Sequence, residues 1–89
     1  MTFTTERLPL AIYLHASGCL VFERCERVGD RKISFVFDDP KGRGDEEELE
    51  FDRGAPLSAS GLFASQKFLR RKMTETLNIG ESYAHTSHR

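Results

Sequence analysis

Two segments of alternating polarity, separated by a short turn, constrain the fold of this chain more than any other feature. The stretches CLVFERCER (19–27) and RKISFVFDD (31–39) flank the turn VGD. Side chains two residues apart along a strand lie on the same face of a sheet, and the apolar positions here follow that period. The pattern predicts a β-hairpin with one face in the core, formed by Leu20, Phe22, Ile33, Phe35 and Phe37.

A first helix is predicted ahead of the hairpin. Proline suits the first turn of a helix and not its interior, so this helix should begin at Pro9. Gly18 is a natural left-handed stop. The residues between them carry an apolar stripe made of Leu10, Ala11 and Leu14.

The segment DEEELEFDRG (45–54) is compatible with two structures. Leu49 and Phe51 alternate as in a strand, whereas a run of Glu is favourable in the first turns of a helix and disfavoured in a strand. We interpret the segment as a short helix from about Asp45 to Arg53, closed by Gly54.

A long helix is predicted to follow. It would be capped by Ser58 or Ser60 and would run to about Leu77 with one apolar stripe, made of Leu62, Leu69, Met73 and Leu77. The polar residues 79–89 are expected to form a tail. Residues 1–78 are thus predicted to be a single α+β domain, with an N-terminal helix, a β-hairpin, a short helix and a long C-terminal helix packed on one face of the hairpin.

Charge is divided unevenly along the chain. Residues 1–52 carry 12 acidic and 7 basic side chains, whereas residues 53–89 carry 6 basic and 2 acidic ones. The net charge of the whole chain is only −1. This division favours complementary packing within the fold or between copies at least as much as it favours an external ligand.

The apolar segments, the N-terminal stretch and the cysteines together predict where the protein is located. The longest apolar run, residues 8–14, is much shorter than the roughly 20 residues that span a membrane. The N-terminal stretch has no basic region ahead of a long apolar one. Cys19 and Cys25 are too far apart along one predicted strand to form a disulfide. We therefore expect a cytoplasmic protein with reduced cysteines and no membrane contact.

The stretch LAIYLHASGCLVFERCERVGDRKISFVFDD resembles a family of short bacterial and phage proteins that have no assigned activity. Those proteins carry an LAAFLL-type helix, a glycine and a hairpin ending in an FVFED-like strand. The similarity continues through EFDRG and FASQKFLRRKM, and it covers about residues 8–73. Leu69-Arg70 replaces a Leu-Lys pair of the family, and the loop PKGRGD is richer in glycine. The resemblance implies the same α+β fold and assigns no functional residue.

No pattern in the sequence predicts catalysis. The carboxylates of Asp38, Asp39 and residues 45–48 are compatible with the divalent-metal cluster of a small nuclease, but a solvated acidic helix start explains them better. His15 is interpreted as structural. No nucleophile motif and no phosphate-binding glycine loop is present. We expect a protein that is not an enzyme, with no catalytic residues, no cofactor and no metal.

The stretch FLRRKM (68–73) raises the question of nucleic-acid binding. Successive helical residues are about 100° apart, so its three cations diverge around the helix instead of forming one stripe. This divergence is typical of a solvated helix face. Phe68 falls roughly opposite the predicted apolar stripe, so we expect it to touch another element of the fold or a second chain. The candidate partner contacts are Lys67, Phe68, Arg71 and Lys72.

The sequence therefore favours a small non-enzymatic binding or interaction protein, carried by a phage or mobile element. The alternative is a nucleic-acid-binding accessory protein that uses the basic face of the last helix. A two-stranded hairpin leaves both edges unpaired, and Val21, Cys25 and Val36 put apolar groups on its second face. We therefore expect a homodimer, or a protein partner, that covers the hairpin, and we regard nucleic acid as the less favoured partner.

Overall fold

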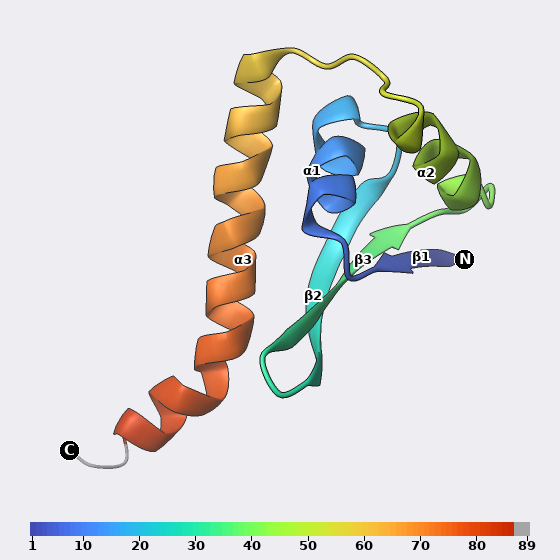
Figure 1. Ribbon diagram of the computed structural model, residues 1–89. Coiled ribbons are helices and arrows are strands. Elements are labelled where there is room, and N and C mark those ends of the chain that lie inside the picture. Colours follow the sequence, from blue (N-terminus) through green and yellow to red (C-terminus); the bar gives the residue numbers. More distant parts are fainter. Residues whose placement is uncertain (87–89) are drawn as a thin grey trace.

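The computed structural model describes residues 1–86, and it describes the side chains of residues 1–77 (Figure 1). The order of the elements is β1 (Thr2–Thr5), α1 (Leu8–Ser17), β2 (Val21–Gly29), β3 (Lys32–Asp38), α2 (Gly44–Asp52) and α3 (Ala59–Thr86). The predicted α+β class is confirmed, and so is the order of helix, hairpin, short helix and long helix.

The sheet has a third strand that the sequence did not predict. Its order is β1-β3-β2, so β3 is the central strand and pairs with antiparallel neighbours on both sides. Phe3 of β1 lies opposite Phe37 of β3. The expectation that both edges of the hairpin are unpaired is therefore wrong, because β1 covers the outer edge of β3. A four-residue strand is too short to produce a clear alternating pattern in the sequence.

One face of the sheet forms the core, as the alternation predicted. Helices α1 and α3 lie against this face (Figure 1). The predicted residues of the hairpin pack together, with Phe22 at the partly buried margin and the other four buried. The helices contribute the remaining buried apolar side chains, which are Leu10, Ala11, Tyr13, Leu14 and Leu69.

An irregularity in β2 changes which side chains point inward. The register between β2 and β3 shifts between Phe22 and Arg24, and Cys25 then lies opposite Phe35. Cys25 therefore packs against the core, and the prediction that it faces the second side of the hairpin is wrong. A β-bulge inserts one residue and reverses the side on which the following residues lie, and the sequence gives no signal for it.

The second face of the sheet is covered by its own charged side chains. Val36 points to this face and is nevertheless buried, because it lies on the central strand between Thr4 and Arg24. The guanidinium of Arg24 forms ion pairs with Glu23 at 2.9 Å and with Glu26 at 2.8 Å. Because Arg24 lies opposite Val36, this cluster places charged side chains next to Val36 on the second face.

Helix α2 is fixed to the sheet by a close backbone contact. Gly44, the first residue of α2, lies directly against the ring of Phe3. A Cβ atom at position 44 would collide with the side chain of Phe3, so only glycine fits without a shift of β1.

Helix α3 is longer than predicted, and most of its predicted apolar stripe packs on the core. It runs to Thr86, so the predicted polar tail begins within it. The hydroxyl of Ser58 accepts a hydrogen bond from the Gly61 N–H at 3.2 Å, which identifies Ser58 as the cap. Ser65 and Leu69 are buried, whereas Leu62 is 36% exposed. The predicted stripe is therefore confirmed at Leu69, Met73 and Leu77, which pack on the core. Leu62 lies on the same side of the helix but is partly exposed, and the buried side also includes Ser65, which was not predicted.

None of the helices within the described residues is both long enough and apolar enough to cross a membrane.

Candidate functional site

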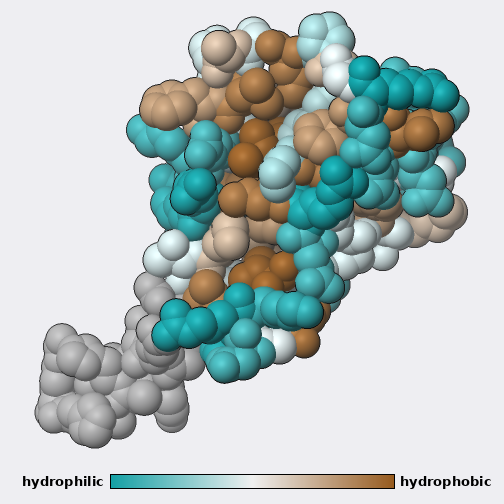
Figure 2. All heavy atoms as spheres, viewed as in Figure 1, coloured by the Kyte–Doolittle hydropathy of each residue, from teal (hydrophilic) through white to brown (hydrophobic). Residues whose placement is uncertain are grey.

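The outer side of α3 carries a groove formed by side chains of successive helical turns. We call it the α3 groove. Its volume is about 540 Å³, and it is lined by Ser60, Phe63, Ala64, Lys67, Phe68 and Arg71. Figure 2 shows apolar side chains gathered along α3 and in the seam between α3 and α1. The groove therefore combines apolar surface with basic side chains on one rigid element.

Phe63 is the most exposed aromatic side chain of this groove. It is 65% exposed, and the Lys67 ammonium lies 5.9 Å from the centre of its ring. The sequence reasoning assigned no role to Phe63. At about 100° per residue, Phe63 lies about 120° around the helix from Leu69, so the predicted stripe itself places Phe63 outside the buried side.

Phe68 contacts other elements of the fold, which confirms the expectation that it touches protein. Its ring stacks on the imidazole of His15 from α1, with centroids 4.6 Å apart and planes 16° apart. It also meets Phe22 of β2 edge-on at 5.6 Å. Phe68 is half-buried, and it joins α3 to both α1 and β2 while part of it still lines the groove.

The basic side chains near Phe68 differ in their surroundings. The Arg71 guanidinium lies 5.9 Å and the Lys72 ammonium 5.5 Å from the centre of the Phe68 ring. Lys72 is half-buried and pairs with Glu75 at 3.6 Å. Lys67 and Arg71 form no ion pair with any side chain of residues 1–77. The structure thus brings Lys67, Phe68 and Arg71 together in the groove, and it places Lys72 on the inner side.

His15 lies in the interface between α1 and α3. Its Nδ1 atom is hydrogen-bonded to the hydroxyl of Ser65 at 2.8 Å, and its ring also meets Phe22 edge-on at 6.5 Å. Burial lowers the pKa of His15 below its ordinary value of 6.5. The arrangement supports the structural interpretation of His15, since its serine partner is buried within the helix.

We expect the protein to lose stability as the pH falls below 6.5 because of His15. Above that pH the imidazole is neutral in both the folded and the unfolded chain. Below it the unfolded chain takes up a proton that the folded chain resists until its own lowered pKa is reached, and this difference favours unfolding. Thermal unfolding at about pH 7.5 and about pH 5.5 measures the effect.

His15→Gln is the control for this pH dependence. Glutamine keeps a polar group near Ser65 but does not titrate. The variant should show a smaller change in melting temperature between the two pH values than the parent protein. An equal change in both proteins would mean that His15 does not cause it.

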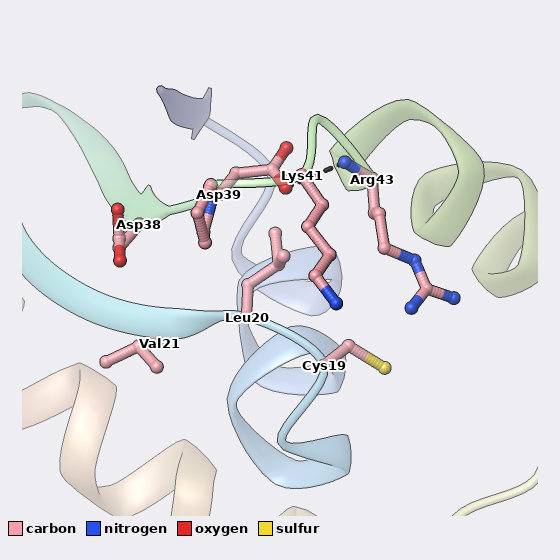
Figure 3. Close-up of a pocket in the computed structure, with 8 residues that line it drawn as sticks. Cys19, Leu20, Val21, Asp38, Asp39, Lys41 and Arg43 are labelled. Atoms are coloured by element: carbon pink, nitrogen blue, oxygen red, sulfur yellow. Dashed lines mark hydrogen bonds between the residues drawn. The ribbon is translucent and has the colours of Figure 1, made fainter.

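A second, smaller hollow lies between the start of β2 and the loop that precedes α2 (Figure 3). Its volume is about 250 Å³, and its lining includes Cys19, Asp39, Lys41 and Arg43. The buried carboxylate of Asp39 accepts hydrogen bonds from the backbone N–H of Arg43 at 2.7 Å and of Gly44 at 2.8 Å. Asp39 therefore caps α2. The side chains of Lys41 and Arg43 extend away from it (Figure 3).

The smaller hollow offers little reactive chemistry. Burial raises the pKa of the Cys19 thiol, which donates a hydrogen bond to Glu47 at 3.2 Å. A protonated thiol is a weak nucleophile. Within the described part of the chain, no group of three His, Cys, Asp or Glu side chains is arranged to hold a metal ion. The α3 groove is therefore the better candidate for a functional surface.

No protein-family model matches this chain, and no curated protein or solved structure matches it either. The resemblance to a family of short bacterial and phage proteins stays a prediction, and the functional argument depends on the surfaces described above.

Proposed function

We propose that this chain is a small non-enzymatic interaction protein that binds an acidic segment of a protein in the α3 groove. The observation that carries the proposal is the exposed ring of Phe63 in a groove that also holds two cations, Lys67 and Arg71, with no ion-pair partner among residues 1–77. An exposed aromatic residue next to positive charge is typical of a contact surface.

The energetics of the groove favour an apolar residue flanked by carboxylates as its ligand. Burying a phenylalanine side chain contributes about 1.5–3 kcal/mol, and Phe63 is available for such a contact. Lys67 and Arg71 lie one turn apart on the helix. These two cations would select an acidic ligand and orient it in the groove, and they would add less to its affinity.

Nucleic acid is the alternative ligand, because aromatic and basic residues alternate along the groove. The surroundings of Phe68 argue against it. His15 covers one face of that ring, and two cations lie near its centre. A base would have to displace these groups in order to stack. With few unpaired cations on the helix, the electrostatic attraction for a phosphate backbone is also small.

The hairpin is the other surface at which a protein partner or a second copy would bind. Strand β2 has only β3 as a neighbour in the sheet, so its outer edge offers unpaired backbone groups. Its bulge and its charged side chains make it a less regular template than the groove. We therefore prefer the groove and treat the hairpin as an outcome of the tests below.

The proposal includes the origin of the chain and its location in the cell. The resemblance to short bacterial and phage proteins supports a chain carried by a phage or mobile element. The two cysteines, Cys19 and Cys25, are free, which is consistent with a reducing compartment such as the cytoplasm.

A residue-resolved titration tests the proposal. The probe is a synthetic peptide of about 20 residues made of Ala, Glu and Leu, because isolated helices shorter than about 12–15 residues are marginal in water. In two-dimensional ¹⁵N NMR spectra at physiological salt, it should produce saturable shifts centred on residues 60–71. The same peptide with Gln in place of Glu should produce much smaller shifts.

Charge-reversed variants show whether the groove is responsible. Lys67→Glu with Arg71→Glu should abolish the shifts, whereas Lys32→Glu with Lys41→Glu makes the same charge change on exposed residues elsewhere and should preserve them. We expect single- and double-stranded DNA and RNA to bind no tighter than about 10⁻⁴ to 10⁻⁶ M. Submicromolar nucleic-acid binding that the groove variant removes would establish the alternative function.

A further inference from the structure

The outward face of α2 is chemically complementary to the α3 groove. Its central residue is Leu49, which is 50% exposed. Asp45 and Glu46 lie on the same side of the helix, at positions i−4 and i−3 from Leu49, and Glu50 at i+1 lies at the margin of this side. All three are exposed. An apolar side chain surrounded by carboxylates is the ligand chemistry that the groove favours.

The two complementary faces lie on opposite sides of the molecule. Helix α1 stands between α3 and α2 (Figure 1), and it contacts both of them. The α2 face and the α3 groove of one chain therefore cannot meet each other, whereas those of two chains can.

We propose that the α3 groove binds the outward face of α2 from a second copy of this chain. In this contact Leu49 packs against Phe63, and the carboxylates around Leu49 approach Lys67 and Arg71. The inference rests on the proposed function, because it uses the same groove and names its ligand.

The dimensions of the two elements agree. Helix α2 has nine residues and is about 13 Å long at 1.5 Å per residue. The groove extends from Ser60 to Arg71 along α3, which is about 16 Å by the same rise. A single α2 helix therefore fits within the length of the groove.

The carboxylates of α2 are free to change partners. Glu46 lies 3.8 Å from Arg43, and Glu50 lies 3.4 Å from Arg53, in ion pairs that are exposed on both sides. Exposed pairs of this kind contribute little to stability. Exchange of these partners for Lys67 and Arg71 of a second copy thus has a low cost.

The geometry predicts a head-to-tail assembly of copies. A contact between two different faces of the same molecule is head-to-tail, and it produces a ring or a filament unlike the closed dimer of a self-complementary contact. One short helix in one groove is a small interface, so the association should be weak and dependent on concentration. It should also weaken with added salt, because exposed charges are screened.

Sedimentation velocity of the full chain tests this assembly. We expect the weight-average mass to rise continuously with concentration beyond that of a dimer, and to fall when salt is raised from about 0.05 M to about 0.5 M. Phe63→Ala should remove most of this rise. Val21→Ala is the matched control, since Val21 is 67% exposed and lies outside the groove, and it should leave the rise unchanged.

A charge swap separates this contact from a folding defect. Lys67→Glu with Arg71→Glu makes α3 acidic, and Glu46→Lys with Glu50→Lys makes α2 basic. Each double variant alone should be monomeric, because its two faces then have the same charge. Mixing the two variants, or combining all four substitutions in one chain, should restore association.

Three results would overturn the inference. A mixture that stays monomeric would exclude the α2–α3 contact. Association that stops at a dimer and survives both double variants would favour the hairpin instead. If the chain stays monomeric near 1 mM but binds the acidic peptide saturably, the proposed function is retained and the second copy is rejected as the ligand. If the chain neither associates nor binds the peptide, the proposed function is rejected as well.

Discussion

Replacing Phe35 with alanine should lower the free energy of unfolding by about 3–5 kcal/mol. Phe35 is fully buried on the central strand, between Thr5 of β1 and Cys25 of β2. Its removal leaves a cavity beneath all three strands. Because small domains have a total stability of only about 5–15 kcal/mol, the variant should be partly unfolded at 37 °C. Urea unfolding followed by circular dichroism measures the change.

Val28→Ala is the control for Phe35→Ala. Val28 lies in β2 and is exposed, so its truncation should change stability by about 0.5 kcal/mol or less. Similar losses in the two variants would mean that Phe35 is not central to the core.

Leu69→Ala should lower the free energy of unfolding by about 2–5 kcal/mol. Leu69 is the fully buried apolar side chain through which α3 packs on the core. Its loss weakens the attachment of α3 to the rest of the domain, so thermal unfolding followed by circular dichroism should begin at a lower temperature.

Leu62→Ala makes the same chemical change on the same helix and should cost about 1 kcal/mol or less, because Leu62 already faces water in part. The comparison measures how far the exposure of Leu62 reduces its contribution to stability. Equal losses at the two positions would mean that Leu62 is as deeply buried as Leu69 and would contradict the observed exposure.

The hairpin and the helices were predictable because their signals are local. Alternation at Ile33, Phe35 and Phe37 identifies the inner face of β3 without any knowledge of its neighbours. Gly18 and Gly54 follow the first two helices, and both adopt the left-handed backbone that glycine favours. These features depend on a few adjacent residues, so the sequence contains them directly.

The full width of the buried side of α3 was not predictable in the same way. Leu69, Met73 and Leu77 pack on the core as the apolar stripe predicted, but the buried side extends to Ser65, a small polar residue that bonds to His15. Polar residues that find a partner in another element carry no hydrophobic signal. The contact between α3 and α1 therefore became visible only with both helices in place.

The strand order has a consequence for how the chain folds during synthesis. β1 and β2 both pair with β3, so neither has a strand partner until residues 32–38 have left the ribosome. The β2–β3 hairpin closes a very short loop, whereas the pairing of Thr5 with Phe35 must close one of about 30 residues at a higher entropic cost. The sheet thus assembles from its middle outward, and the first strand to be made is the last to be joined.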